Sequence, residues 1–214
     1  MEKTMGDRLH ILPINVGIFQ TNCYIVTSDN ARTAVVIDPG DEADSIAAAV
    51  RGMNADLTAI LLTHAHYDHI CAVNELKAMW PDLLVYASAK EKPMFLDPAL
   101  NSGFGPASYK VMPDVWLTED EPLSFFGKKW TVLETPGHTA GSICFYVADE
   151  GVLFAGDTMF RRSYGRYDLP TGSLAEIRES LKRLLTTLPD ETVVYTGHGS
   201  ATKIGEEKTL YSFS

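Results

Sequence analysis

Alternation of apolar and polar residues in the first sixty positions predicts strands. Leu9 to Val16 alternates loosely, and Asn22 to Thr27 combines Tyr, Ile and Val. Gly17 and the polar pair Gln20-Thr21 lie between them, which indicates a hairpin. Two continuous apolar runs follow, and each ends at a polar segment: Ala34 to Ile37 before Asp38-Pro39-Gly40, and Leu57 to Leu62 before Thr63.

Apolar residues spaced three and four apart predict three helices. The first covers Asp44 to Arg51, and the second runs from about His69 to Trp80, where Pro81 stops it. The third covers Ser173 to Leu188, and Ser173 and Glu176 form a capping box at its start.

The second half of the chain predicts a further series of strands. They lie around Trp116 and at 123–125, 130–134, 142–147, 152–155 and 193–196. Between the two series, Lys92 to Asp114 carries four prolines and two glycines and is predicted as an irregular loop over the core face. Strands followed by helices occur twice without a linker. We therefore expect residues 1–214 to form one α/β domain with two sheet-plus-helix layers.

Composition and charge narrow the function classes. The net charge of −10 disfavours nucleic acid as a partner, because an acidic surface repels phosphates. Three well-separated cysteines without a CxxC pair suit reduced thiols in the cytoplasm. Residues 1–10 lack the apolar core of a signal peptide, and no apolar run is long enough to span a membrane. A cytoplasmic protein that acts on small molecules is the expectation.

Three of the six histidines crowd into His64-Ala65-His66-Tyr67-Asp68-His69, directly after a buried apolar run. Neutral imidazole and carboxylate are the usual ligands of zinc and similar divalent ions. His64 and His66 alternate past a strand end and can point to the same side, whereas Asp68 and His69 begin a helix. Four potential ligands in six residues suit two adjacent metal ions better than one.

Three more potential ligands follow predicted strands. His138 and His198 each come after a strand and a glycine-bearing turn, and Asp157 follows Gly156 after another apolar run. Asp157 could offer one oxygen to each of two metals. His10 has no such setting and is expected to be structural.

The segment Thr63 to His69 resembles the signature of the metallo-β-lactamase superfamily. Four other segments occur in that family's order: Asp38-Pro39-Gly40, Thr135 to Ser142, Ala155 to Thr158 and Gly197-His198-Gly199. The resemblance covers residues from about 10 to 205. It implies a four-layer αββα sandwich with metals at one edge.

This resemblance also implies roles for the site residues. His64, His66 and His138 would hold one metal, Asp68, His69 and His198 a second, and Asp157 would bridge both. The metals would be two divalent ions, zinc first, with iron or manganese as alternatives. Asp68 and Asp157 would take part in catalysis. Asp38, Thr63 and Thr139 would support the ligand loops, although Asp38 is equally compatible with a simple turn residue.

The segment Gly165 to Pro170 is similar to the hydroxyacylglutathione hydrolase (glyoxalase II-like) branch, and so are 199–202 and 205–207. The helical domain that binds glutathione in full-length glyoxalase II is not expected within residues 1–214. The sequence is therefore more similar to the short, single-domain members of this branch. The branch implies a small thioester substrate, cleaved by a hydroxide that bridges the metals. Tyr67 and Arg166 are candidates for substrate contacts. Arg166, like Arg161 and Arg162, is also compatible with solvated surface.

Several alternatives remain. A persulfide dioxygenase of the same fold would hold one iron with His64, His138 and Asp157. The expected lack of a flavin domain disfavours a non-catalytic module like the flavodiiron relatives. The expected lack of an export signal disfavours a secreted β-lactamase, and the expected lack of an extra domain disfavours an RNA-processing enzyme. Cys71 replaces a glycine frequent in the family and is interpreted as core packing rather than as a metal or redox residue.

Overall fold

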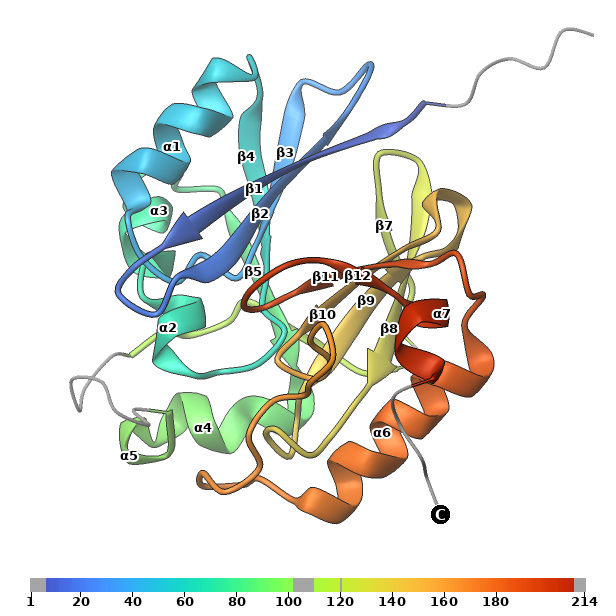
Figure 1. Ribbon diagram of the computed structural model, residues 1–214. Coiled ribbons are helices and arrows are strands. Elements are labelled where there is room, and N and C mark those ends of the chain that lie inside the picture. Colours follow the sequence, from blue (N-terminus) through green and yellow to red (C-terminus); the bar gives the residue numbers. More distant parts are fainter. Residues whose placement is uncertain (1–6, 102–109, 120, 210–214) are drawn as a thin grey trace, which may run out of the picture.

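The computed structural model describes residues 7–101, 110–119 and 121–209, and it has two six-stranded sheets stacked face to face (Figure 1). In the first sheet the spatial order is the chain order, β1-β2-β3-β4-β5-β6. The first three strands pair antiparallel and the last four pair parallel. The bounds are β1 Leu9–Val16, β2 Thr21–Ser28, β3 Thr33–Ile37, β4 Asp56–Leu61, β5 Leu84–Ser88 and β6 Val115–Leu117.

The second sheet has the order β12-β11-β10-β9-β8-β7. Its pairs are antiparallel except for β10 and β11, which run parallel. The parallel pair matters for function because both strands end at the same edge of the sheet. The bounds are β7 Leu123–Phe125, β8 Lys128–Glu134, β9 Ile143–Val147, β10 Val152–Gly156, β11 Val193–Thr196 and β12 Thr202–Lys203.

Helices cover the outer face of each sheet, which completes the αββα order expected from the sequence (Figure 1). Ile46 of α1 and Leu76 of α3 are fully buried in the cluster outside the first sheet. Leu181 of α6 is fully buried outside the second. The bounds are α1 Ala43–Gly52, α2 Tyr67–Ile70, α3 Val73–Met79, α4 Lys92–Leu96, α5 Pro98–Asn101, α6 Leu174–Thr187 and α7 Ile204–Lys208, with 3₁₀ turns η1 Ala89–Glu91 and η2 Ala148–Glu150.

A third apolar cluster fills the space between the sheets. Val35 and Leu61 of the first sheet and Trp130 and Phe154 of the second belong to it, and all four are buried. The rings of Trp130 and Phe154 stack with their centroids 5.6 Å apart. This rigid interior holds the strand ends at one edge, where the chain turns carry the polar residues.

Most predicted elements are confirmed, but the helix predicted from about His69 to Trp80 is wrong in its course. It begins at Tyr67, breaks after Ile70 and resumes as α3. At the break, the N–H of Ala72 donates to the carbonyl of Pro39 at 3.0 Å. A Cβ on Gly40 would lie only 1.7 Å from the carbonyl oxygen of Asp68, so the 38–40 turn is pressed against α2.

Two further corrections concern the middle of the chain. The prediction of an irregular loop from Lys92 to Asp114 is wrong for α4 and α5, although residues 102–109 lie outside the described part. Pro93 lies in the first turn of α4 and Pro98 begins α5, positions where the missing N–H costs little. Strands β5 and β12 and helix α7 were not predicted from the sequence.

Candidate metal centre

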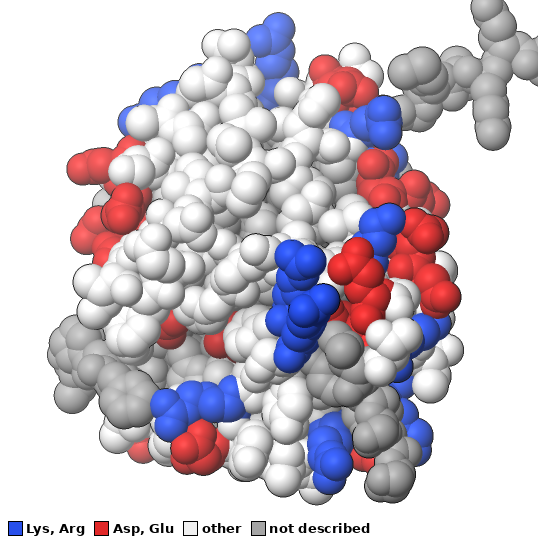
Figure 2. Space-filling model, viewed as in Figure 1, with Lys and Arg blue, Asp and Glu red and all other residues white. Residues whose placement is uncertain are grey.

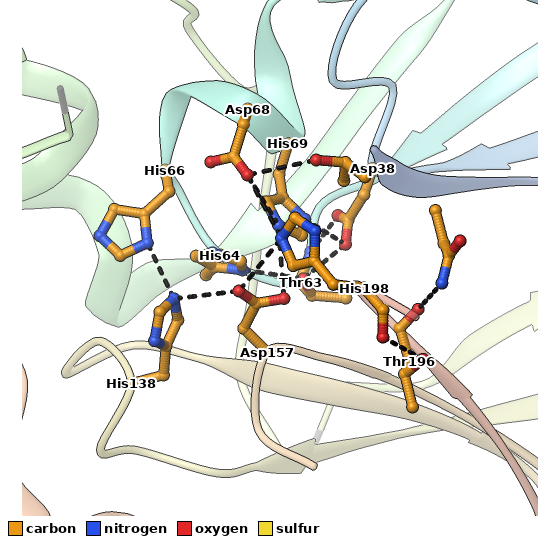
Figure 3. A network of polar contacts seen from close by, with 12 residues as sticks. Asp38, Thr63, His64, His66, Asp68, His69, His138, Asp157, Thr196 and His198 are labelled. Atoms are coloured by element: carbon orange, nitrogen blue, oxygen red, sulfur yellow. Dashed lines mark hydrogen bonds and ion pairs between the residues drawn. The ribbon is translucent and has the colours of Figure 1, made fainter. Parts of the chain in front are cut away.

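The predicted donors meet at one edge of the sandwich, each just beyond the end of a strand (Figure 3). After β4 the chain passes through His64 and His66 into α2, which carries Asp68 and His69. The β8–β9 connection carries His138. Asp157 follows β10 and His198 follows β11. The structure thus brings together all seven predicted ligands.

His64, His66 and His138 form the first group. A nitrogen from each lies within 4.8 Å of the others, and all three side chains are buried. Nδ1 of His66 and Nε2 of His138 lie 2.9 Å apart. Three imidazole nitrogens converging on one point are a common arrangement of zinc ligands.

Asp68, His69 and His198 form the second group, also with donor atoms within 4.8 Å of one another. Oδ2 of Asp68 lies 3.3 Å from Nε2 of His198 and 3.7 Å from Nε2 of His69. This group combines one carboxylate with two imidazoles, a donor set that suits zinc and iron.

Asp157 lies between the two groups. Its Oδ1 is 3.4 Å from Nε2 of His69, and its Oδ2 is 3.6 Å from Nε2 of His138 and 3.5 Å from Nε2 of His198. One carboxylate therefore contacts histidines of both groups, which is the position that a bridging ligand requires.

Four of the histidines are oriented through the ring nitrogen that points away from the centre. In each, Nδ1 lies against an oxygen of the protein, which leaves Nε2 directed inward. The partners are the Thr63 hydroxyl for His64 at 3.0 Å, an Asp38 oxygen for His69 at 3.0 Å, the Arg166 carbonyl for His138 at 2.6 Å and the Phe19 carbonyl for His198 at 3.1 Å.

Asp38 supports this arrangement rather than occupying a simple turn position. Its Oδ1 accepts from the N–H of Thr63 at 2.8 Å, and its Oδ2 accepts from the Thr63 hydroxyl at 2.6 Å and lies against His69. Because the Thr63 hydroxyl donates to Asp38, it accepts from Nδ1 of His64. One buried carboxylate therefore orients a histidine of each group.

Electrostatics distinguish the two groups. Burial lowers the pKa of His64, His66 and His138, that of His66 to about 3, so these rings are neutral as ligands must be. Burial also lowers the pKa of His69 and His198, but the nearby carboxylates outweigh it and raise the values to about 9 and 10.

The two aspartates respond in the opposite direction. Burial alone would raise the pKa of Asp68 and Asp157, but the surrounding histidines lower both below the usual range. Both are therefore carboxylates at neutral pH, which is the form that binds a cation.

Buried polar atoms without partners provide the test of whether metal ions fit. Nε2 of His64, Nε2 of His66, Nε2 of His69 and Oδ1 of Asp157 are buried and have no hydrogen-bond partner among the described residues. Such atoms are costly to bury unless something binds them. Nε2 of His69 and Oδ1 of Asp157 lie 3.4 Å apart within the centre, so the donor set fits divalent metal ions.

A pocket of about 330 Å³ opens onto the centre. Its floor includes Asp68 and Asp157, and its walls are mainly apolar, with Phe19, Tyr67, Phe160 and Leu169. The rings of Phe19 and Tyr67 meet edge to face, 5.7 Å between centroids. Figure 2 shows that the neighbouring surface over β1 and β2 is largely uncharged.

The remaining predicted residues fall in different places. Tyr67 and Arg166 line the pocket, and Arg166 forms an ion pair with Asp168 at 2.8 Å. The Thr139 hydroxyl lies 2.6 Å from the Ser142 hydroxyl and shapes the loop that carries His138. Arg161 and Arg162 are exposed and are not among the described residues that line the pocket.

Cys71 and His10 lie outside the donor groups. Burial raises the pKa of Cys71 to about 12, which opposes a thiolate role and agrees with the packing interpretation. His10 pairs with Asp29 on the surface. The three cysteines form no disulfide.

Several residues that hold the donors in place were not predicted from the sequence. The Thr21 hydroxyl donates to Asp68 at 3.2 Å, and the side-chain amide of Asn22 donates to the carbonyls of Thr196 and Gly199. A signal for Asn22 was available, because this polar residue begins a predicted strand, whereas Thr21 was predicted in the turn before that strand. Glu91 also contacts the ligand loops and had no comparable signal.

No described helix is both long and apolar enough to cross a membrane.

Comparison with known proteins places this site in a family context. Residues 16–198 match the family model of the metallo-beta-lactamase superfamily. The chain is 34% identical to hydroxyacylglutathione hydrolase GloC of Haemophilus influenzae over 208 residues, covering 96% of this chain and 97% of that protein.

Two solved structures are similar along nearly their full length. The B3 metallo-beta-lactamase BLEG-1 superposes with a TM-score of 0.87 at 36% identity, covering 94% of this chain and 97% of that one. The protein TTHA1623, crystallised in a di-iron-bound form, superposes with a TM-score of 0.81 at 36% identity, covering 95% and 100%.

Proposed function

The chain belongs to the metallo-β-lactamase superfamily of metal-dependent hydrolases, and we propose that this protein cleaves a small acyl thioester. The position of Asp157 between the two donor groups is the observation that carries the proposal. A site of this kind needs no serine or cysteine nucleophile. Residues 1–214 would form one domain with this activity.

We propose that His64, His66 and His138 hold one metal ion, that Asp68, His69 and His198 hold the other, and that Asp157 contacts both. When bound, two divalent ions would lower the pKa of coordinated water to about 7 and polarise a carbonyl. Zinc suits the nitrogen and oxygen donors. Iron suits them too, and the di-iron form of the related TTHA1623 protein supports it as an alternative.

The protein's own residues would bind and orient the substrate. Phe19, Tyr67 and Phe160 offer an apolar wall for the acyl group and keep water from it. Asp68 faces the pocket as a carboxylate, so it can accept a proton there. A thiolate is a good leaving group and needs little help from a general acid. Arg166, held by Asp168, would meet the far end of the substrate.

The substrate proposal rests on the pocket and on the GloC relative. An apolar wall beside two groups of metal donors suits a short acyl chain joined to a thiol. We expect S-lactoylglutathione to be cleaved with a high KM, because Arg166 is the one Lys or Arg among the described residues that line the pocket, and it is paired with Asp168.

The test is a thiol-release assay with a trapping dye across several acyl thioesters, run on zinc-loaded and iron-loaded protein. Oxygen uptake on glutathione persulfide and hydrolysis of a β-lactam are measured in parallel. Thioester cleavage by the zinc form is the expected result. Oxygen uptake by the iron form without thioester cleavage would contradict the thioesterase proposal. It would favour a persulfide dioxygenase with one iron ion, which His64, His138 and Asp157 would hold.

A further inference from the structure

Glu91 is a carboxylate buried at the end of η1, between β5 and α4, with 1% of its surface exposed. Its Oε2 accepts a hydrogen bond from the N–H of Ala65 at 2.8 Å. Its Oε1 accepts one from the N–H of Gly141 at 2.9 Å. Glu91 is outside the proposed ligand set, and yet both of its oxygens are used.

The two N–H groups belong to the segments that carry the first donor group. Ala65 lies between His64 and His66, and Gly141 lies three residues after His138. These segments are far apart in the sequence and come from different sheets. The side chain of Glu91 is therefore a direct link between them.

The surroundings of Glu91 leave little freedom. A Cβ on Gly141 would lie 2.4 Å from the backbone nitrogen of Glu91, so only glycine permits this approach. Next to it, the ammonium of Lys90 contacts Glu134 at 2.6 Å, which ties η1 to the end of β8. A buried carboxylate with two charge-assisted hydrogen bonds is a rigid connection.

The second donor group is held by other contacts. His198 is oriented by the Phe19 carbonyl and His69 by Asp38. The hydrogen bonds that Glu91 accepts from Ala65 and Gly141 reach neither of these histidines. A change at Glu91 should consequently affect one metal position more than the other.

We propose that Glu91 is a positioning residue that sets the spacing between the His64–His66 segment and His138, and so the affinity of the metal they share. This inference rests on the proposed metal-binding role of these three histidines. Glutamine at this position would keep the shape but turn an amide N–H toward a backbone N–H, which breaks one of the two links.

The experiment is cobalt titration of metal-free protein, with affinities from chelator competition and the visible spectrum of each site. His138→Ala and His198→Ala identify which transition belongs to which group. We expect Glu91→Gln to weaken the first site about 10- to 100-fold, as supporting residues typically do, and to leave the second within about threefold. Glu179→Gln, on the exposed face of α6, is the matched control.

A second variant keeps the test decisive if Glu91→Gln folds poorly. Glu91→Asp keeps the charge but is too short to reach both N–H groups, so the same site-selective loss should appear in smaller measure. Thermal unfolding of each metal-free variant checks that the fold persists.

The outcomes separate the inference from the proposed function. Equal weakening of both sites, or unchanged affinity in a folded variant, would overturn the inference alone. A wild-type protein without metal at the first group would overturn both. Failure to cleave thioesters with intact metal binding would overturn only the substrate.

Discussion

The two sheets contribute to the metal centre in different ways. The first supplies four donors from one short segment, His64 to His69, at the end of a single strand. The second supplies three, His138, Asp157 and His198, each from a different strand end. The first set is placed mainly by local geometry. The second depends on three separate strand ends, so a substitution of one of its donors should leave the positions of the other two unchanged.

Removing the shared carboxylate tests the comparison most severely. We expect Asp157→Ala to reduce activity by at least about 1,000-fold, beyond the 10–100-fold of supporting residues, and to remove at least one metal. Its oxygens contact histidines of both groups. Elemental analysis and initial rates measure the effect. A slight loss, equal to that of Asp38→Ala, would mean that the bridge is misplaced.

Removing one histidine at a time separates the two groups. Wild-type protein should carry close to two metals per chain, and His138→Ala and His198→Ala about one each, with activity lower by about 100-fold or more. Metal analysis of both variants, with crystal structures of the metal-loaded forms, shows which position remains filled. Retention of one metal by wild-type protein, with Asp68, His69 and His198 empty, would contradict the two-metal arrangement.

Changing Asp38 to asparagine tests the support shared by both groups. Asp38 has a φ of 50°, and asparagine tolerates this left-handed backbone. The amide can still accept from Thr63 but cannot accept from both Thr63 and His69 as the carboxylate does. Activity and metal affinity should fall about 10- to 100-fold. Asp44→Asn, an exposed position in α1, should behave as wild type.

The smallest effect is expected at the pocket wall. Phe19→Ala removes a ring that lines the pocket but keeps the backbone carbonyl that orients His198. KM should rise about three- to tenfold with little change in kcat, because ground-state and transition-state binding weaken alike. Ile18→Ala, at a residue 88% exposed, is the control. A loss confined to kcat would instead assign the ring a role in orienting His198.

The sequence was informative where the signal is local. The αββα order followed from periodicity and the family motif, and the ends of most strands were placed within a residue or two. The errors lie where distant contacts decide. The break in the helix predicted from about His69 to Trp80 involves a hydrogen bond to the Pro39 carbonyl. Prolines lie in the first turn of α4 and at the start of α5, although they had indicated a loop.

The site shows the same division. The donors between His64 and His69 were recognisable because four of them lie within six residues, and the structure places the scattered donors beside them. Asn22 could have been found as a polar residue at the start of a predicted strand, whereas Thr21 was predicted in the turn. Glu91 could not be found in this way, because the hydrogen bonds that it accepts from Ala65 and Gly141 come from backbone N–H groups, 26 and 50 residues away. Every residue except proline has a backbone N–H, so the residue types of such partners give no signal in the sequence.

The contacts between the first hairpin and the last ligand turn bear on how the protein assembles. Phe19 touches His198, and Asn22 binds Gly199, across 179 and 177 residues. Contacts so distant along the chain form slowly, since a large loop must close first. A nascent chain therefore cannot complete the second donor group until residue 199 has emerged and met the hairpin. During refolding, metal binding at the second donor group should consequently occur only after the turn at 198–199 has packed against the hairpin.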